Sequence, residues 1–233
     1  MSILPEFLRI KNVPTVSWSS DRPLNFKPKI KTLFFLVLGL TIFGFGESLL
    51  IHSAIGLSPW VVLAEGLAIN FNWSIGFAMF ASSVGVLLFW LPLKQQPGVG
   101  TILNIIVIAG TIELSMYLFD FSTDSNFINL IVGSIGVALV GFGSGIYLTA
   151  NLGPGPRDGL MTGLQRVTQY PIAWVRVCIE VSVVGVGWIL GGTVGVGTLL
   201  FAFGIGPAVA LGLYLVANCL LYTSPSPRDG RES

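Results

Sequence analysis

The stretch Asn151-Leu152-Gly153-Pro154-Gly155-Pro156-Arg157-Asp158-Gly159 interrupts two long apolar runs with glycine and proline, and the interpretation of the whole chain begins there. A related interruption, Ala54-Ile55-Gly56-Leu57-Ser58-Pro59-Trp60, lies 97 residues upstream. At this offset Gly56 and Pro59 correspond to Gly153 and Pro156. Two such breaks, each between apolar segments, predict that the chain consists of two halves built alike.

The composition indicates a polytopic helical membrane protein. Hydrophobic residues make up 53% of the 233 residues and charged residues only 10%, and the mean hydropathy is +0.82. A soluble domain of this length needs more polar residues to cover its core. The net charge of +1 gives no reason to expect a nucleic-acid partner. With one histidine and two cysteines we expect no metal site, no disulfide framework and no cofactor.

Six segments approach the ~20 apolar residues that a helix needs to cross a bilayer. They are 33–52, 75–93, 101–119, 127–150, 172–190 and 198–218. With six crossings, Lys94, Arg157 and Arg166 fall on the cytoplasmic side, and the opposite loops contain no lysine or arginine. Both termini are then expected in the cytoplasm. The loops expected outside are 53–74, 120–126 and 191–197.

The two halves correspond without a gap at the offset of 97. Gly44-Phe45-Gly46 recurs as Gly141-Phe142-Gly143, and Gly98-Val99-Gly100-Thr101 recurs as Gly195-Val196-Gly197-Thr198. Three crossings per half bring the second half into the membrane upside down. The predicted fold is therefore all-α, with six transmembrane helices in a 3+3 inverted-topology repeat and Gly/Pro-broken half-helices at 54–72 and 151–171.

These boundaries divide the chain into four parts. Residues 1–32, which are polar and rich in lysine, arginine and proline, are expected to form a loose cytoplasmic tail. The membrane repeats are 33–120 and 127–218. Residues 219–233 read like the translation of a sequencing-library adapter, and we interpret them as a non-native tail, of which the polar residues 223–233 are excluded from the predicted fold.

The break before Pro156 has the residues of a helix start. Proline has a preset φ and no N–H, which suits the first helical turn, and Asp158 in that turn is favoured by the helix dipole. The free N–H groups of such a turn can bind an anion, with Arg157 beside them. Asp158 could hold Arg157 while the site is empty. Two interpretations of 156–170 remain open: a half-helix that begins at membrane depth, or a cytoplasmic loop followed by an interfacial helix.

Charges within the apolar segments have no charged counterpart in the other half. The correspondences are Glu47 with Ser144, Glu113 with Ala210, Arg157 with Trp60, Asp158 with Val61, Arg176 with Met79 and Glu180 with Ser83. A charge at the bilayer centre costs roughly 2.5–3.5 kcal/mol on insertion scales, so these residues should face the protein interior. By their positions in the segments, Glu47 and Glu113 should lie toward the outer side and the others toward the inner side.

Two pairs of these residues carry separate expectations. Arg176 and Glu180 are four residues apart, which places both on one helical face, either as a neutral packing element or as part of a site. Glu47 and Glu113 could carry protons if each is held in a low dielectric without a cation. The alternative is that each is a protonated carboxyl group hydrogen-bonded between helices.

Several of these motifs also resemble a known family. Gly-Pro-Gly-Pro-Arg-Asp-Gly-Leu-Met at 153–161, Val175-Arg176 with Glu180, Gly187-Trp188-Ile189-Leu190-Gly191-Gly192 and Ile205-Gly206-Pro207 are similar to the YczE/YyaS/YitT group of bacterial integral membrane proteins. The first motif resembles the YczE-like branch, and the resemblance covers about residues 39–216. It implies a small protein of the bacterial inner membrane and brings no established activity or substrate. Glu47 and Glu113 lie outside these motifs.

Two classes of function remain. The first is a secondary transporter or permease for a small polar, anionic or zwitterionic solute in the bacterial inner membrane. Its binding site would combine Gly56, Ser58 and Pro59 with Gly153, Gly155, Pro156, Arg157 and Asp158. The alternative is a non-transporting membrane factor that scaffolds or regulates a cytoplasmic or membrane partner. The expected partners are the lipid bilayer and a small solute, with a homo-oligomer left open. We expect no enzyme, because no Ser-His or paired-Asp constellation is present.

Overall fold

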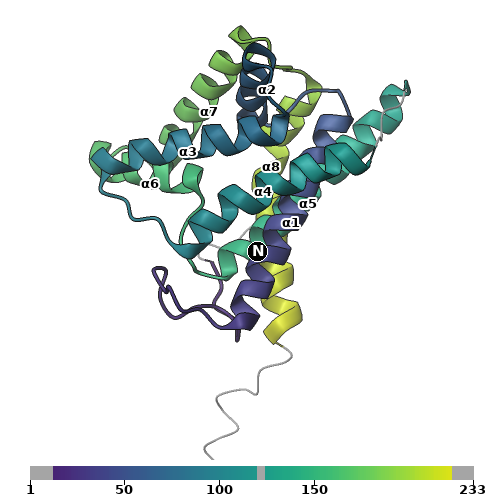
Figure 1. Ribbon diagram of the computed structural model, residues 1–233. Helices are drawn as coiled ribbons and strands as arrows, with labels where there is room; N and C mark the ends of the chain where they lie inside the picture. Colours follow the sequence, from purple (N-terminus) through teal and green to yellow (C-terminus); the bar gives the residue numbers. More distant parts are fainter. Residues whose placement is uncertain (1–12, 120–123, 222–233) are drawn as a thin grey trace, which may run out of the picture.

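The computed structural model describes residues 13–119 and 124–221, and this part of the chain forms eight α-helices (Figure 1). They are α1 (Ile30–His52), α2 (Pro59–Phe71), α3 (Ile75–Leu93), α4 (Val99–Leu118), α5 (Asn126–Thr149), α6 (Pro156–Thr168), α7 (Ile172–Ile189) and α8 (Val196–Leu221). Within the described residues, six helices, all but α2 and α6, are long and apolar enough to cross a membrane. The predicted all-helical fold with six such helices is confirmed.

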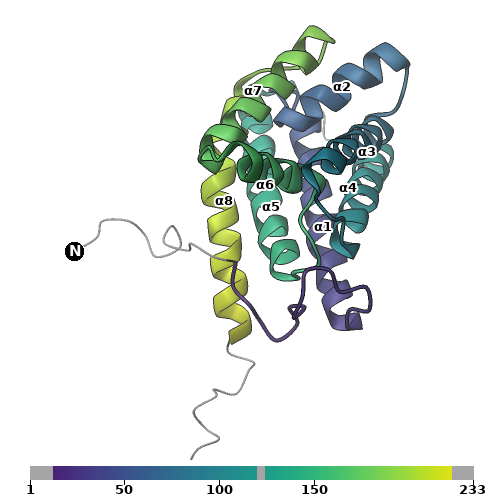
Figure 2. The same ribbon diagram turned by 90° about the vertical axis from the view of Figure 1, so that its left-hand side faces the viewer.

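The long helices α1, α5 and α8 run side by side, and α4 packs against α1 (Figures 1 and 2). Glycines allow α1 and α5 to cross closely. A Cβ atom added at Gly46 would lie 2.7 Å from the carbonyl oxygen of Gly136, and one added at Gly143 would lie 2.6 Å from that of Gly39. Larger residues would push the helices apart. Gly46 and Gly143 end the two Gly-Phe-Gly triplets, so this crossing explains why both halves contain the triplet.

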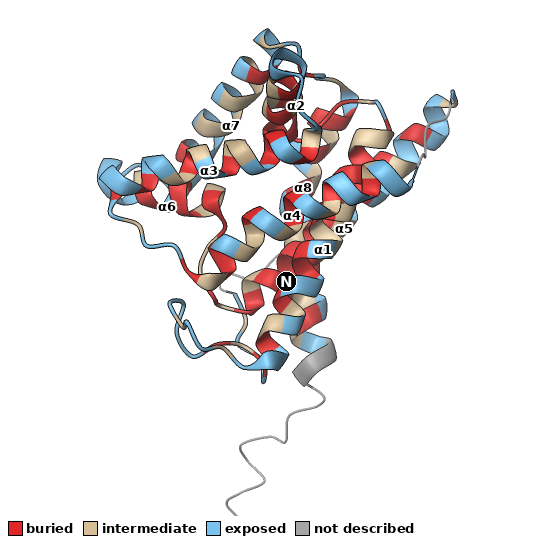
Figure 3. Ribbon diagram, viewed as in Figure 1, coloured by how far each residue is buried: buried red, intermediate tan, exposed pale blue. Residues whose placement is uncertain are grey.

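Each short helix packs on a long helix from the other half: α2 on α7, and α6 on α3. Gly187 of α7 lies against the backbone of Val62 and Leu63, and Gly159 of α6 lies against the indole ring of Trp90. The main cluster of buried residues includes residues of α1, α2, α3, α4 and α5, whereas α7 is mostly open to its surroundings (Figure 3). The short helices therefore add to the contacts that the α1–α5 crossing makes between the two halves.

The helix boundaries recur at the offset of 97. The starts of α2 and α6, of α3 and α7, and of α4 and α8 are all separated by this number of residues. At both breaks the chain bonds to the start of a helix in the other half. The N–H of Gly197 donates to the carbonyl of Ile55, and the N–H of Gly100 donates to that of Leu152, both at 2.8 Å. The two breaks thus have matching backbone surroundings.

Residues 13–29 are bound to the body of the protein, so the prediction of a loose tail is wrong for them. Trp18 is 1% exposed and stacks on Phe35 with ring centroids 4.5 Å apart. The hydroxyl of Ser19 donates to the carbonyl of Thr149 at 2.6 Å, and the N–H of Ser20 donates to that of Ala150 at 3.0 Å. The polar composition of this segment suggested a loose tail, but one buried aromatic residue and several backbone hydrogen bonds fix it to the protein. Residues 1–12 and 222–233, which include most of the predicted non-native tail, lie outside the described residues.

The buried position of Trp18 makes its contribution measurable. We expect Trp18→Ala to lower the free energy of unfolding by about 3–5 kcal/mol, the usual cost of truncating a buried tryptophan or phenylalanine. Phe26→Ala is the control, because Phe26 belongs to the same segment and is 68% exposed. Thermal unfolding of both variants in detergent checks the expectation. Equal midpoints would show that this segment does not stabilise the fold.

Candidate functional site

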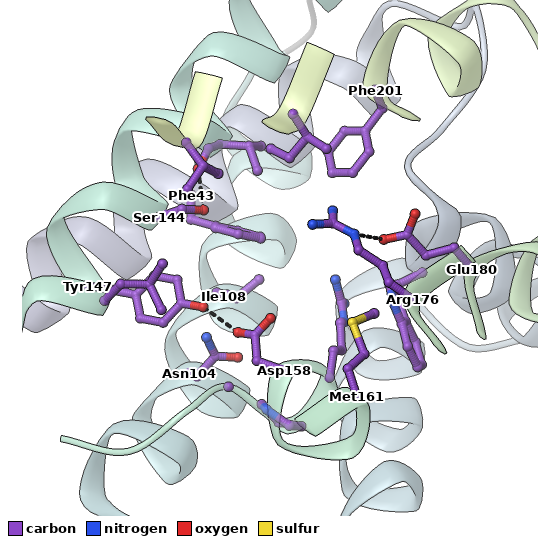
Figure 4. Close-up of a pocket in the computed structure, with 18 residues that line it drawn as sticks. Phe43, Asn104, Ile108, Ser144, Tyr147, Asp158, Met161, Arg176, Glu180 and Phe201 are labelled. Carbon is purple, nitrogen blue, oxygen red and sulfur yellow. Dashed lines mark hydrogen bonds and ion pairs between the residues drawn. The ribbon is translucent and has the colours of Figure 1, made fainter. Parts of the chain in front are cut away.

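A cavity of about 180 Å³ lies among helices of both halves (Figure 4). Its polar and charged lining residues are Asn104, Ser144, Tyr147, Arg157, Asp158, Arg176 and Glu180. Ser144 and Tyr147 come from α5, whereas Arg176 and Glu180 come from α7 and point into the cavity from the other side (Figure 4). The cavity therefore brings together charges that the sequence distributes over separate segments.

Corresponding residues of the two halves line this cavity together. The pairs, each 97 residues apart, are Phe43 with Val140, Trp60 with Arg157, Asn104 with Phe201 and Ile108 with Ile205. The members of one pair are in direct contact, because the guanidinium carbon of Arg157 lies 5.0 Å from the centroid of the Trp60 ring. A residue and its counterpart can share a cavity only where the two halves meet. The cavity thus lies at the junction of the halves, between the starts of α2 and α6.

Arg157 is half-buried and has no carboxylate partner at ion-pair distance among the described residues. Its guanidinium group stacks on Trp60, a favourable cation–π contact. One of its nitrogens, Nη2, donates to the Sδ atom of Met79 at 2.7 Å. A thioether sulfur is a weak acceptor, so most of the donor capacity of this arginine remains available. Arg157 can therefore bind an anion that enters the cavity.

Asp158 is held by other groups than Arg157. It is the third residue of α6, where the helix dipole favours a negative charge, and its Oδ2 accepts a hydrogen bond of 2.6 Å from the Tyr147 hydroxyl (Figure 4). The expectation that Asp158 holds Arg157 in the empty site is not met, because Tyr147 and the helix start already stabilise this carboxylate.

Arg176 and Glu180 form an ion pair within α7, with Nε and Oε1 2.8 Å apart (Figure 4). The i, i+4 spacing places both on the cavity side of the helix. Their side chains are 45% and 20% exposed, so the pair is less enclosed than we expected from its place in an apolar segment. The reason is that α7 contributes only Val175 and Gly187 as buried residues. The main contribution of the pair is therefore to the charge of the cavity wall, and its contribution to packing is small.

The structure divides the predicted binding residues into two groups. Gly155, Pro156, Arg157 and Asp158 line the cavity. The residues predicted from the upstream break do not line the cavity; they are Gly56, Ser58 and Pro59. The neighbouring residue Trp60, which was not predicted, does line it.

The first glycine of each break, Gly56 or Gly153, forms a backbone turn away from the cavity. Gly56 and Gly153 have φ values of +122° and +107°, which favour glycine. Their Cα atoms lie against the backbones of Gly195 and Gly98, just before α8 and α4. These glycines shape the breaks, whereas the residues that follow them reach the cavity.

Glu47 and Glu113 lie in different environments. Glu47 is completely buried, and neither carboxyl oxygen has a hydrogen-bond partner among the described residues. The buried Ser58 hydroxyl also lacks a hydrogen-bond partner in the described part of the chain. Glu113 is exposed in an open groove between α3 and α4, beside Gly76.

Asn104 and Tyr147 were not predicted from the sequence. Asn104 corresponds to Phe201, and Tyr147 corresponds to Leu50. Our comparison of corresponding positions considered only charged residues. Extending it to uncharged polar residues would have identified both, because each replaces an apolar counterpart within an apolar helix.

Comparison with known proteins agrees with this description of a membrane protein. A group described as "Family of unknown function (DUF6198)" matches residues 30–213, from the start of α1 into α8. A Haemophilus influenzae protein named "Uncharacterized protein" is 41% identical over 210 residues, covering 90% of this chain and 95% of the relative. The "Uncharacterized membrane protein YczE" of Bacillus subtilis is 32% identical over 206 residues, covering 83% of this chain and 94% of the relative.

A second Bacillus subtilis relative, "Uncharacterized protein YyaS", is 26% identical over 175 residues, covering 70% of this chain and 83% of the relative. No solved structure matches the chain. The match to YczE spans most of both chains and the family match includes every helix that lines the cavity, which confirms the resemblance drawn from the motifs. The chain is therefore a YczE-like membrane protein of the family DUF6198.

Proposed function

We propose that this protein is a secondary transporter, and that it moves a small polar solute carrying a negative charge through the cavity at the junction of its two halves. The observation that carries the proposal is Arg157, a cation in this cavity whose guanidinium group lacks an ion-pair partner among the described residues. Placing such a charge among apolar helices costs free energy, and intramembrane charges of this kind mark substrate and ion pathways.

The matching breaks support the same function. In transporters with inverted repeats, discontinuous helices meet at the substrate site, and rocking of one half against the other exposes the site to each side in turn. Here the helices that follow the breaks, α2 and α6, meet through Trp60 and Arg157. We propose that the two halves have opposite orientations in the bacterial inner membrane and that both termini are cytoplasmic.

The size of the cavity limits the solute. The cavity volume of about 180 Å³ favours a small solute. Arg157 would bind its anionic group. Asp158 and Glu180 offer carboxylates to a cationic group, so that a small zwitterion also fits. The proposal includes no catalytic step.

Solute uptake into proteoliposomes tests this function. We expect saturable uptake, above that of protein-free liposomes, of at least one member of a panel containing nitrate, acetate and glycine. Urea, which is of similar size but uncharged, should not enter faster than without protein. If no member of the panel moves, the non-transporting scaffold function replaces the proposal.

A further inference from the structure

The described helices pack in two groups, and neither group is one half of the sequence. In the first group, the short-helix bundle, α2 packs on α7, α7 on α6, α6 on α3 and α3 on α2 (Figure 1). In the second, the long-helix bundle, α1 packs on both α4 and α5, and α5 packs on α8 (Figure 2). Across the boundary, α3 packs on α4, and α4 makes a smaller contact with α6. Each half of the sequence thus contributes two helices to each bundle.

The cavity lies at this boundary, and the two bundles line it with different kinds of residue. The long-helix bundle contributes apolar side chains and the neutral polar residues Asn104, Ser144 and Tyr147. Among the described residues, the charged side chains of the cavity all belong to the short-helix bundle; they are Arg157 and Asp158 of α6, with Arg176 and Glu180 of α7 (Figure 4). A solute that binds these charges is therefore held by one bundle.

Four segments connect the two bundles, and each contains at least one residue with positive φ. The segments are 53–58 (with Ala54 and Gly56), 94–98 (with Lys94), 150–155 (with Asn151 and Gly153) and 190–195 (with Gly191). When packed bodies move, the change in backbone angles is absorbed by a few residues in loops or at the ends of helices. These connections have the length and position of such hinges.

The repeated motif Gly-Val-Gly-Thr brings these connections together in two pairs. The second glycine of each copy donates its N–H to a carbonyl in the break of the other half, that of Ile55 or Leu152, at 2.8 Å. The first glycine donates its N–H to the hydroxyl of the threonine in its own copy, at 3.1 Å in 98–101 and at 3.2 Å in 195–198. The motif thus fixes two points at which the bundles are connected.

We propose that the short-helix bundle moves as one body against the long-helix bundle, that it pivots at these two points, and that it carries the charges of the binding site with it. This inference rests on the proposed transport function and specifies which helices move. Inside the cavity the hydroxyl of Tyr147, from the long-helix bundle, donates to Asp158, from the short-helix bundle, at 2.6 Å. This hydrogen bond stabilises the arrangement of the two bundles seen here.

Distances between two spin labels, measured by pulsed electron paramagnetic resonance on the protein in liposomes, distinguish motion of the bundles from motion of the halves. Leu91 of α3, Tyr117 of α4 and Ile189 of α7 are suitable sites, because their side chains are 75%, 86% and 82% exposed. Leu91 and Ile189 belong to the same bundle but to different halves. Leu91 and Tyr117 belong to the same half but to different bundles. Cysteines at these sites carry the labels, in a protein with Cys178→Ser and Cys219→Ser.

We expect one narrow distance between the labels at 91 and 189, and two distances between those at 91 and 117. Tyr147→Phe removes the hydrogen bond between the bundles, so it should change the ratio of the two distances and leave the first pair unaffected. The reverse pattern would show that the halves move against each other, and it would overturn the inference. A single distance for both pairs would overturn it too.

A failure of this inference is distinguishable from a failure of the proposed function, because the distances are measured without solute. Uptake of nitrate and of glycine is measured with the same labelled proteins in proteoliposomes. If either solute is taken up while the distance between 91 and 117 stays single, the motion of the bundles is wrong and the transport function stands.

Discussion

Replacing Arg157 by glutamine should abolish solute uptake while the protein remains inserted and folded. Glutamine keeps much of the side-chain volume and some hydrogen-bonding capacity but removes the positive charge from the cavity. Loss of a charged binding partner in an enclosed site costs 2–5 kcal/mol, so we expect uptake of an anionic solute to fall by about 100-fold. Uptake into proteoliposomes measures the loss, and the unfolding midpoint in detergent shows whether the fold is kept.

Two further variants make this result specific. Arg166→Gln removes a charge from the same helix outside the cavity, where Arg166 donates to the carbonyl of Leu93, and it should retain uptake. Arg157→Lys keeps the charge but loses the planar guanidinium group that stacks on Trp60, so an intermediate rate is expected. Wild-type uptake by Arg157→Gln would remove the basis of the proposed site.

Arg176→Ala and Glu180→Ala should each reduce uptake by about tenfold, and the double variant should be more active than either single variant. A single change leaves an uncompensated charge at the cavity wall and alters the charge balance that the solute meets. Because Arg176 is 45% exposed, we expect a small effect on stability. The uptake rates of the four proteins form a double-mutant cycle, and losses that simply add would show that the two residues act independently.

The helices of this protein could be predicted from the sequence, because apolar runs of membrane-spanning length alternate with glycine and proline breaks. The predicted starts of the six long helices differ from the observed ones by at most three residues. The start of α6 at Pro156 also follows from local chemistry, since proline at the first position and Asp158 in the first turn favour it. These features depend on neighbouring residues only.

The contacts between distant segments could not be predicted in the same way. We placed Glu47 and Arg157 on opposite sides of the membrane from their positions in the apolar segments. In the structure Arg157, near the start of α6, lines the same cavity as Phe43, which precedes Glu47 by about one helical turn in α1. The burial of Trp18 could not be predicted for a similar reason. Its partner Phe35 lies on α1, and the polar segment that contains Trp18 folds back against this helix.

The central claim is that the cavity opens to both sides of the membrane in turn, and a cysteine at Asn104 tests it without knowledge of the solute. Asn104 lines the cavity, and the variant would also carry Cys178→Ser and Cys219→Ser. Ser125→Cys and Gln95→Cys serve as controls for the outer and cytoplasmic sides. We predict that a membrane-impermeant maleimide labels Asn104→Cys both in intact cells and in inverted vesicles, whereas each control is labelled in one preparation only. Labelling of Asn104→Cys from one side only, or from neither, would contradict the account.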